Sequence, residues 1–158
     1  YQFQWWALGL VGARPAVADQ KKGSNRGIDG RLFFHDEGPS GKTKQAIFSV
    51  KGGHTNVSDV RDLGHVVDRE KAQIGVLITL QESTQPMRSE AASAGFYESA
   101  WGTHSRLQVL TIAELLAGKH IDMPPVGQVN VTFKRAPKAQ ATGPSQQSLL
   151  GSSQEAND

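Results

Sequence analysis

The residues of this sequence with the clearest chemical potential are an aspartate and a lysine, each at the end of a strand-like run. Asp29 lies between Ile28 and Gly30, and Lys51 closes the run 46–50 and is followed at once by two glycines. A lysine at the end of a buried strand is costly unless its ammonium reaches water or a partner. The glycines leave the backbone uncovered, so that something bulky can approach it. A carboxylate, a lysine and open backbone together suit a magnesium ion and a phosphate.

The same residues also allow two interpretations that involve no chemistry. Side chains alternate along a strand, so Ser49 and Lys51 share one face, and Asp29 lies beside Lys51 if the two runs pair. That arrangement could be a plain cross-strand ion pair, worth under about 1 kcal/mol. It could equally be a strand end whose lysine reaches water before a flexible turn. The glycines at positions 27, 30, 52 and 53 favour a site over a plain pair.

Composition limits the classes of protein to which the chain can belong. Its 158 residues are enough for one domain with a real core. No apolar stretch approaches the roughly 20 residues of a membrane span, so no membrane segment is expected. The absence of cysteine excludes a disulfide framework and a thiolate zinc site, and it fits a reducing, cytoplasmic compartment. The net charge of +2 is compatible with nucleic acid but does not demand it.

The two ends of the sequence differ from its middle. The chain opens on YQFQWWALGL, which has the pattern of a helix already in progress and no initiator methionine, so a fragment of a longer protein is expected. The pattern predicts one domain over residues 1–121. Residues 122–158 form a tail rich in Pro, Ser and Gln, which is expected to be disordered after about residue 135.

Helices and strands are expected to alternate along the domain. A first helix over residues 1–13 should bury Phe3, Trp6, Leu10 and Val11, and only one of the adjacent Trp5 and Trp6 should lie in the core. The further elements are expected as strands at 27–34 and 43–53, a helix at 56–72, a strand at 74–80, a helix at 84–97, a strand at 106–111 and a helix at 112–118. This order predicts an α/β fold, in which a mixed sheet is flanked by helices on both faces.

Taken in order, these segments resemble the PD-(D/E)xK restriction-endonuclease fold, in which an acid in one strand is followed by a hairpin and a strand ending in x-x-Lys. The similarity is greatest to the Mrr-like branch, on the segments NRGIDG, FSVKGG, IGVLITLQESTQPMRSEAASAGFY and LQVLTIAELLAG. It covers residues 1 to about 120 and implies a restriction-endonuclease-like αβββαβ core with an αβ extension. The segments are also similar to regions C-terminal to bacterial DNA methyltransferase domains.

The resemblance implies roles for individual residues. Asp29 would be the metal-binding acid, and the backbone carbonyl of Val50 would be a further metal ligand. Lys51 would orient the attacking water or stabilise the pentavalent phosphorus. At the third catalytic position the sequence departs from the pattern, because Ser49 stands where Glu, Asp or Gln is usual, and the first helix carries glutamine where an acid is often present. The implied cofactor is Mg²⁺, for which Mn²⁺ could substitute.

The cations near this site indicate duplex DNA as the partner. They would neutralise several phosphates and make binding strongly dependent on salt. The candidate DNA-binding residues are Lys21, Lys22, Arg26, Lys44 and His54. The resemblance leaves room for a homodimer and for a DNA methyltransferase domain in the parent chain, and no membrane partner is expected.

Two functions from different classes remain open, and a third interpretation is an unrelated α/β domain with a chance match. The main prediction is a magnesium-dependent DNA endonuclease of a bacterial restriction or defence system, which the presence of both Asp29 and Lys51 favours. The alternative is a catalytically weak or inactive DNA-binding module of the same fold, attached to a DNA methyltransferase, which Ser49 favours.

Overall fold

The computed structural model describes residues 2–16, 27–35 and 41–124 of the chain. The chain divides into two compact units, Tyr1–Pro124 and Pro125–Asp158, and all described residues belong to the first. The basic loop at 17–26, the tip of the loop at 36–40 and the tail expected after about residue 135 lie outside the described residues.

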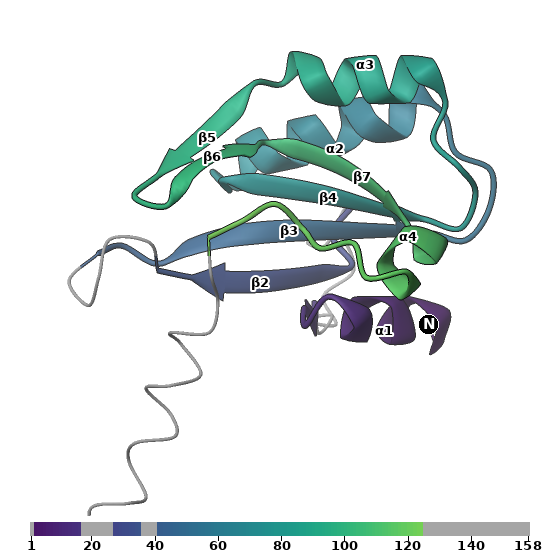
Figure 1. Ribbon diagram of the computed structural model, residues 1–158, viewed down its shortest axis with the longest axis horizontal. Coiled ribbons are helices and arrows are strands. Elements are labelled where there is room, and N and C mark those ends of the chain that lie inside the picture. Colours follow the sequence, from purple (N-terminus) through teal and green to yellow (C-terminus); the bar gives the residue numbers. More distant parts are fainter. Residues whose placement is uncertain (1, 17–26, 36–40, 125–158) are drawn as a thin grey trace, which may run out of the picture. The chain divides into compact units, whose positions relative to one another are not determined.

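A five-stranded mixed sheet forms the centre of the described fold (Figure 1). In spatial order its strands are β1 (Arg14–Pro15), β2 (Gly30–Phe34), β3 (Lys44–Lys51), β4 (Ile74–Thr79) and β7 (Leu107–Thr111). The first three pair antiparallel, whereas β3, β4 and β7 pair parallel. Every residue of β4 is buried, as expected for a parallel strand that is covered on both faces.

Helices cover both faces of this sheet, which confirms the expected α/β class. The described part of the chain contains four helices, α1 (Gln2–Leu10), α2 (Val57–Arg69), α3 (Gln85–Ser93) and α4 (Ile112–Leu116). The pair α1 and α4 packs on one face, and the pair α2 and α3 packs on the other (Figure 1). Side chains of β3 alternate between the two cores, since Phe48 and Val50 join the core on the α1 side and Ile47 joins the core on the α2 side.

Helix α2 forms where its sequence predicts it. The side chain of Asn56 accepts a hydrogen bond from the backbone N–H of Ser58, and a capping box links Asn56 with Asp59. The helix buries one apolar stripe, made of Val60, Leu63, Val66 and Val67. It lies close to β4 because Gly75 has no side chain, and a Cβ there would come within 2.5 Å of Val67 Cγ2.

The apolar face predicted for the first helix is half wrong. Phe3 and Val11 do pack against the core, but Trp6 and Leu10 are exposed. The expectation that one of the two tryptophans lies in the core is also wrong, because Trp5 and Trp6 are 60% and 48% exposed.

The face that α1 buries is fixed by the strand beneath it. Ala7 and Leu8 are fully buried there. Leu8 fits over β2 because Gly30 leaves room for it, and a Cβ at Gly30 would lie 2.5 Å from Leu8 Cδ2. Two faces of this helix are apolar enough to be buried, so a glycine distant in sequence decides between them.

A small two-stranded sheet was not predicted. It consists of β5 (Phe96–Ser99) and β6 (Gly102–Ser105), which pair antiparallel. The helix expected over 84–97 is therefore too long: α3 ends at Ser93, and Gly95 follows with φ +83°, a conformation that ends a helix readily. Within the described part of the chain, no helix is long and apolar enough to cross a membrane.

Candidate functional site

The predicted site lies at one end of the β2–β3 pair. Gly30, the first residue of β2, pairs with Phe48 of β3. Asp29 directly precedes that position, so it lies opposite residues 49–51, where β3 ends. Lys51 is the last residue of β3 and is exposed. The strand pairing therefore brings the predicted acid, the serine and the lysine to the same end of the sheet.

Asp29 makes three hydrogen bonds, which join it to two separate segments. Its carboxylate Oδ2 accepts a hydrogen bond from the backbone N–H of Val50 at 2.7 Å. Its own N–H donates to the carbonyl of Phe48 at 2.8 Å, and its carbonyl accepts from the N–H of Ala16 at 2.9 Å. The N–H and C=O of one strand residue point to the same edge of the strand, so the Val50 carbonyl lies on the edge that faces Asp29. The residue thus joins the segment after β1 to β3 at the start of β2.

Ser49 and Lys51 share the face of β3 opposite to Val50. Ser49 is only 6% exposed, and its hydroxyl makes no hydrogen bond to any described residue. The ammonium of Lys51 likewise forms no ion pair within the described part of the chain. A serine at this position adds no negative charge, so Asp29 is left as the one acid that the sequence predicted for the site.

These residues fit a resident magnesium ion poorly. Across residues 2–16, 27–35 and 41–124, no group of three or more His, Cys, Asp or Glu side chains could hold a metal ion. Magnesium bound by one or two carboxylates relies on water and substrate phosphate for its other ligands. Here the protein would offer one free carboxylate oxygen of Asp29 and the carbonyl of Val50, because the other carboxylate oxygen accepts the Val50 N–H.

The structure brings only part of the predicted DNA-binding set to this end of the sheet. His54 is exposed and follows β3 by three residues. Lys44 lies at the opposite end of the eight-residue strand β3, roughly 23 Å from Lys51 at a rise of about 3.3 Å per residue. Its ammonium lies 5.4 Å from the centroid of the Tyr97 ring. The remaining members, Lys21, Lys22 and Arg26, fall outside the described residues.

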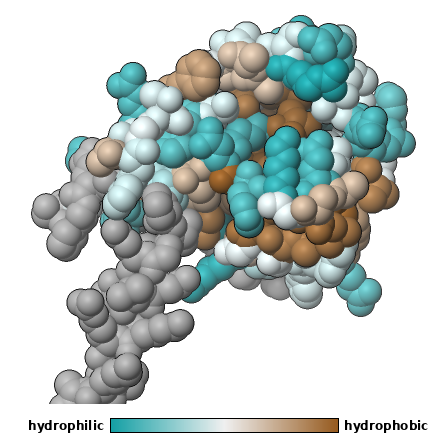
Figure 2. Space-filling view, viewed as in Figure 1, coloured by the Kyte–Doolittle hydropathy of each residue, from teal (hydrophilic) through white to brown (hydrophobic). Residues whose placement is uncertain are grey.

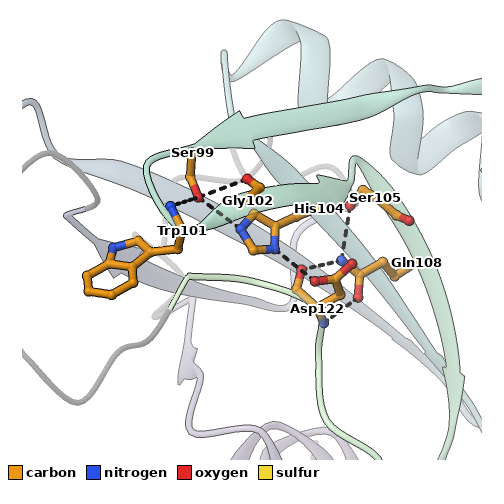
Figure 3. A network of polar contacts seen from close by, with 7 residues as sticks. All are labelled: Ser99, Trp101, Gly102, His104, Ser105, Gln108 and Asp122. Atoms are coloured by element: carbon orange, nitrogen blue, oxygen red, sulfur yellow. Dashed lines mark hydrogen bonds and ion pairs between the residues drawn. The ribbon is translucent and has the colours of Figure 1, made fainter.

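A second group of polar side chains was missed from the sequence (Figure 3). His104 Nε2 lies 2.9 Å from Ser99 Oγ, and His104 Nδ1 lies 2.8 Å from Asp122 Oδ1. The histidine itself is buried. The contacts depend on the unpredicted β5–β6 pairing, and Asp122 had been assigned to the tail, so no local signal in the sequence could have revealed them.

Serine, histidine and aspartate in this order resemble a hydrolytic triad, but the surroundings indicate a structural role. Ser99 Oγ already accepts the N–H of Trp101 at 3.1 Å and lies 3.1 Å from the carbonyl of Gly102. The Asp122 side chain is 57% exposed, whereas the aspartate of a triad is buried.

The same network fastens the chain after α4 to the sheet. The Gln108 side chain of β7 accepts the N–H of Asp122 at 3.0 Å and donates to its carbonyl at 2.7 Å. Asp122 is therefore held by its side chain to β6 and by its backbone to β7 (Figure 3). We interpret the network as a clamp between the hairpin and the segment 121–124.

A family model described as NACHT-associated inactive Restriction Endonuclease 1 matches residues 13–117. No curated protein and no solved structure matches the chain. The matched segment contains all five strands of the main sheet and includes both Asp29 and Lys51.

Proposed function

Because the chain belongs to the family of NACHT-associated inactive restriction endonuclease-like domains, we propose that it is a non-catalytic module that binds duplex DNA without cutting it. The description of the family supports an inactive module better than the magnesium-dependent endonuclease that was the main prediction from the sequence. Membership of the Mrr-like branch, a finer assignment, remains part of the proposal.

The observation that carries this proposal is the buried Ser49. A hydrolytic site of this fold needs anionic ligands that hold the metal ion beside the phosphate. Ser49 supplies no charge at the position of the second acid, and it is only 6% exposed. The remaining acid, Asp29, uses one of its carboxylate oxygens to accept the Val50 N–H. The rival proposal is that Asp29 and the Val50 carbonyl bind Mg²⁺ and that the site cuts DNA. A cleavage assay distinguishes the two proposals.

The proposed contact with DNA starts from Lys51. Its ammonium has no ion-pair partner within the described residues and is exposed at the end of β3, beside two glycines and close in sequence to His54. Such a cation can neutralise a phosphate without any metal. Lys21, Lys22 and Arg26 would add phosphate contacts, in keeping with the isoelectric point near 9.0.

The wider context of the module is also proposed. The family's description associates these domains with NACHT, which suggests that the module works beside other domains. The DNA methyltransferase neighbour and the cytoplasmic location expected from the sequence stay proposals. In either context a domain that holds DNA without cutting it would position its neighbour on the duplex.

The proposal is tested by the anisotropy of a labelled duplex over a series of salt concentrations. Wild-type protein should bind, and log K should fall linearly with log salt, with a slope near –0.9 per phosphate contact. Lys51→Ala should weaken binding to all sequences alike and make the slope shallower by about one. The matched control is Lys42→Ala, since Lys42 is also exposed but precedes the opposite end of β3.

Two results would contradict the proposal. Wild-type protein that fails to bind any duplex even at low salt would exclude the DNA-binding part. Equal effects of Lys51→Ala and Lys42→Ala would show that binding reflects net charge and not this end of the sheet.

A further inference from the structure

Two buried hydroxyl groups near the end of β3 have no hydrogen-bond partner among the described residues. The buried polar residues of that part of the chain are Ser49, Thr55, Thr79, His104 and Thr111. The last three are hydrogen-bonded, Thr79 to a backbone carbonyl, Thr111 to a backbone N–H and His104 within the clamp. Ser49 and Thr55 are only 6% and 4% exposed, yet neither hydroxyl is paired within the described residues. Buried polar groups without a partner are rare because each one costs free energy, so a partner from outside the chain is indicated.

Both hydroxyls lie close to the start of α2. Ser49 is on the same face of β3 as Ile47, and Ile47 shares a core with Val60 in the first turn of α2. Ser49 stands two residues nearer the end of β3, so its side chain points to the side of the sheet that the start of α2 covers. Thr55 directly precedes Asn56, the N-cap of α2. The 13 residues of this helix direct the positive end of its dipole to the same place.

The chain between the two hydroxyls presents unpaired donors. The backbone N–H groups of residues 52–55 have no acceptor among the described residues. Gly52 and Gly53 have no side chain to cover this backbone, and a Cβ at Gly53 would meet nothing within 4 Å. The exposed ammonium of Lys51 adds a charged donor. Hydroxyl, amide and ammonium donors beside a helix N-terminus suit a ligand with several acceptor oxygens, such as a phosphate group.

The charges at this end of the sheet favour an anion of low charge. The carboxylates of Asp29 and Asp59 also lie here, and each already accepts a backbone N–H, at 2.7 and 2.8 Å. The ammonium of Lys51 and the positive end of the α2 dipole offset them. A phosphodiester group of DNA carries a single negative charge, whereas inorganic phosphate carries more. The diester is therefore the better fit.

An apolar surface borders this place. The ring of Phe3 from α1 lies over Gly52, where a Cβ would come within 3.2 Å. Figure 2 shows hydrophobic colour over the region where α1 and α4 lie. Such a border offers no competing polar partner and lowers the local dielectric, which strengthens hydrogen bonds to a charged ligand. The polar contacts of the ligand are therefore expected from residues 49–55 themselves.

We propose that residues 49–55 hold one phosphodiester group of DNA. Its oxygens accept hydrogen bonds from the hydroxyls of Ser49 and Thr55, from N–H groups within residues 52–55 and from the ammonium of Lys51. The inference rests on the proposed function and deepens it, because it adds uncharged donors to the contact that starts from Lys51. The two hydroxyls stay unpaired in the protein alone, since their acceptor belongs to the ligand.

Replacing a hydroxyl by a methyl group tests the proposal in the full chain. Thr55→Val removes an unpaired buried hydroxyl, so the urea midpoint should stay the same or rise. The affinity for a labelled duplex should fall about tenfold, the loss typical of a hydrogen bond to a charged group. Ser49→Ala should behave in the same way. The matched control is Thr111→Val, at a residue that is also 4% exposed but whose hydroxyl accepts the N–H of Glu114. The control should lower the midpoint and leave the affinity unchanged.

A titration of the isotope-labelled chain with dimethyl phosphate, followed by amide NMR, locates the contact. The amides of residues 52–55 should shift with dimethyl phosphate at constant ionic strength and stay in place with sodium chloride. Inorganic phosphate should shift them less at equal concentration. A larger response to inorganic phosphate than to the diester would overturn the assignment to DNA and indicate a site for free phosphate.

Two further results would overturn the proposal. Thr55→Val that lowers the midpoint and keeps the affinity for DNA would show that the hydroxyl has a structural role. Amides of residues 52–55 that respond equally to dimethyl phosphate and chloride would show that no phosphate is held there. Failure of the proposed function is distinguishable, because a wild type that binds no duplex would exclude the DNA-binding module, while the response to dimethyl phosphate would still decide whether residues 49–55 hold a diester.

Discussion

Asp29 is expected to stabilise the fold although the proposed function gives it no catalytic task. Its carboxylate accepts the Val50 N–H at 2.7 Å, and Val50 itself is 3% exposed. Asp29→Ala would leave this buried N–H without an acceptor. The cost of such an unsatisfied donor, together with the loss of a charge-assisted hydrogen bond, is about 1–3 kcal/mol. Asp29→Asn keeps an acceptor oxygen in the same place, so it should cost less than about 1 kcal/mol.

Urea denaturation of wild-type, Asp29→Ala and Asp29→Asn proteins measures this difference. The midpoint should fall clearly for alanine and slightly for asparagine, with the slope m unchanged. Hydrogen exchange of the Val50 amide should be faster in Asp29→Ala alone, which locates the effect. A catalytic acid would behave differently, because residues held for chemistry often cost stability and their removal is neutral or stabilising. Equal stability of all three proteins, or unchanged exchange of the Val50 amide in Asp29→Ala, would refute the structural role of the carboxylate.

Other predictions test the packing and the clamp. Gly75→Ala should destabilise the fold by about 1–3 kcal/mol, because its Cβ would lie 2.5 Å from Val67 Cγ2. Gly53→Ala, at a site with open space, is the control in the same thermal melt. Equal melting temperatures of the two variants would contradict this packing. His104→Ala should cost about 1–3 kcal/mol, since it removes a buried ring together with its contacts to Ser99 Oγ and Asp122 Oδ1, and should speed proteolysis near residues 121–124. DNA binding by this variant should be unchanged, and a loss of binding without unfolding would show that the clamp belongs to the functional site.

Much of the fold follows from local pattern. The all-apolar run of β4 predicts a covered central strand, and Asn56 predicts the start of α2. The hairpin between β2 and β3 follows from two strand-like runs with a turn-rich loop between them. The buried face of α1 does not follow, because Gly30, which receives Leu8, is distant in sequence. The β5–β6 hairpin was hidden because the run after α3 continues the helical pattern past Gly95.

The candidate site was predictable in position but not in chemistry. Strand pairing alone places Asp29 and Lys51 at one end of the sheet, and the restriction-endonuclease-like family predicted from them is confirmed. The hydrogen bond from the Val50 N–H to the Asp29 carboxylate was not predictable. It forms just beyond the last β2–β3 pair, where a side-chain oxygen replaces a backbone carbonyl as the acceptor, and the sequence does not show where that pairing ends. The burial of Ser49 likewise depends on the packing of neighbouring elements, and the sequence shows only that an acid is missing.

Cleavage of supercoiled plasmid, with DNA binding measured on the same samples, tests the central claim most directly. Wild-type protein should bind the plasmid and leave it uncut in magnesium and in manganese, because Ser49 provides no second anionic ligand. Ser49→Asp, checked for native circular dichroism, shows whether adding that ligand creates cleavage. Nicking by the wild type that Asp29→Asn and Lys51→Ala both abolish would contradict the account and establish an active endonuclease.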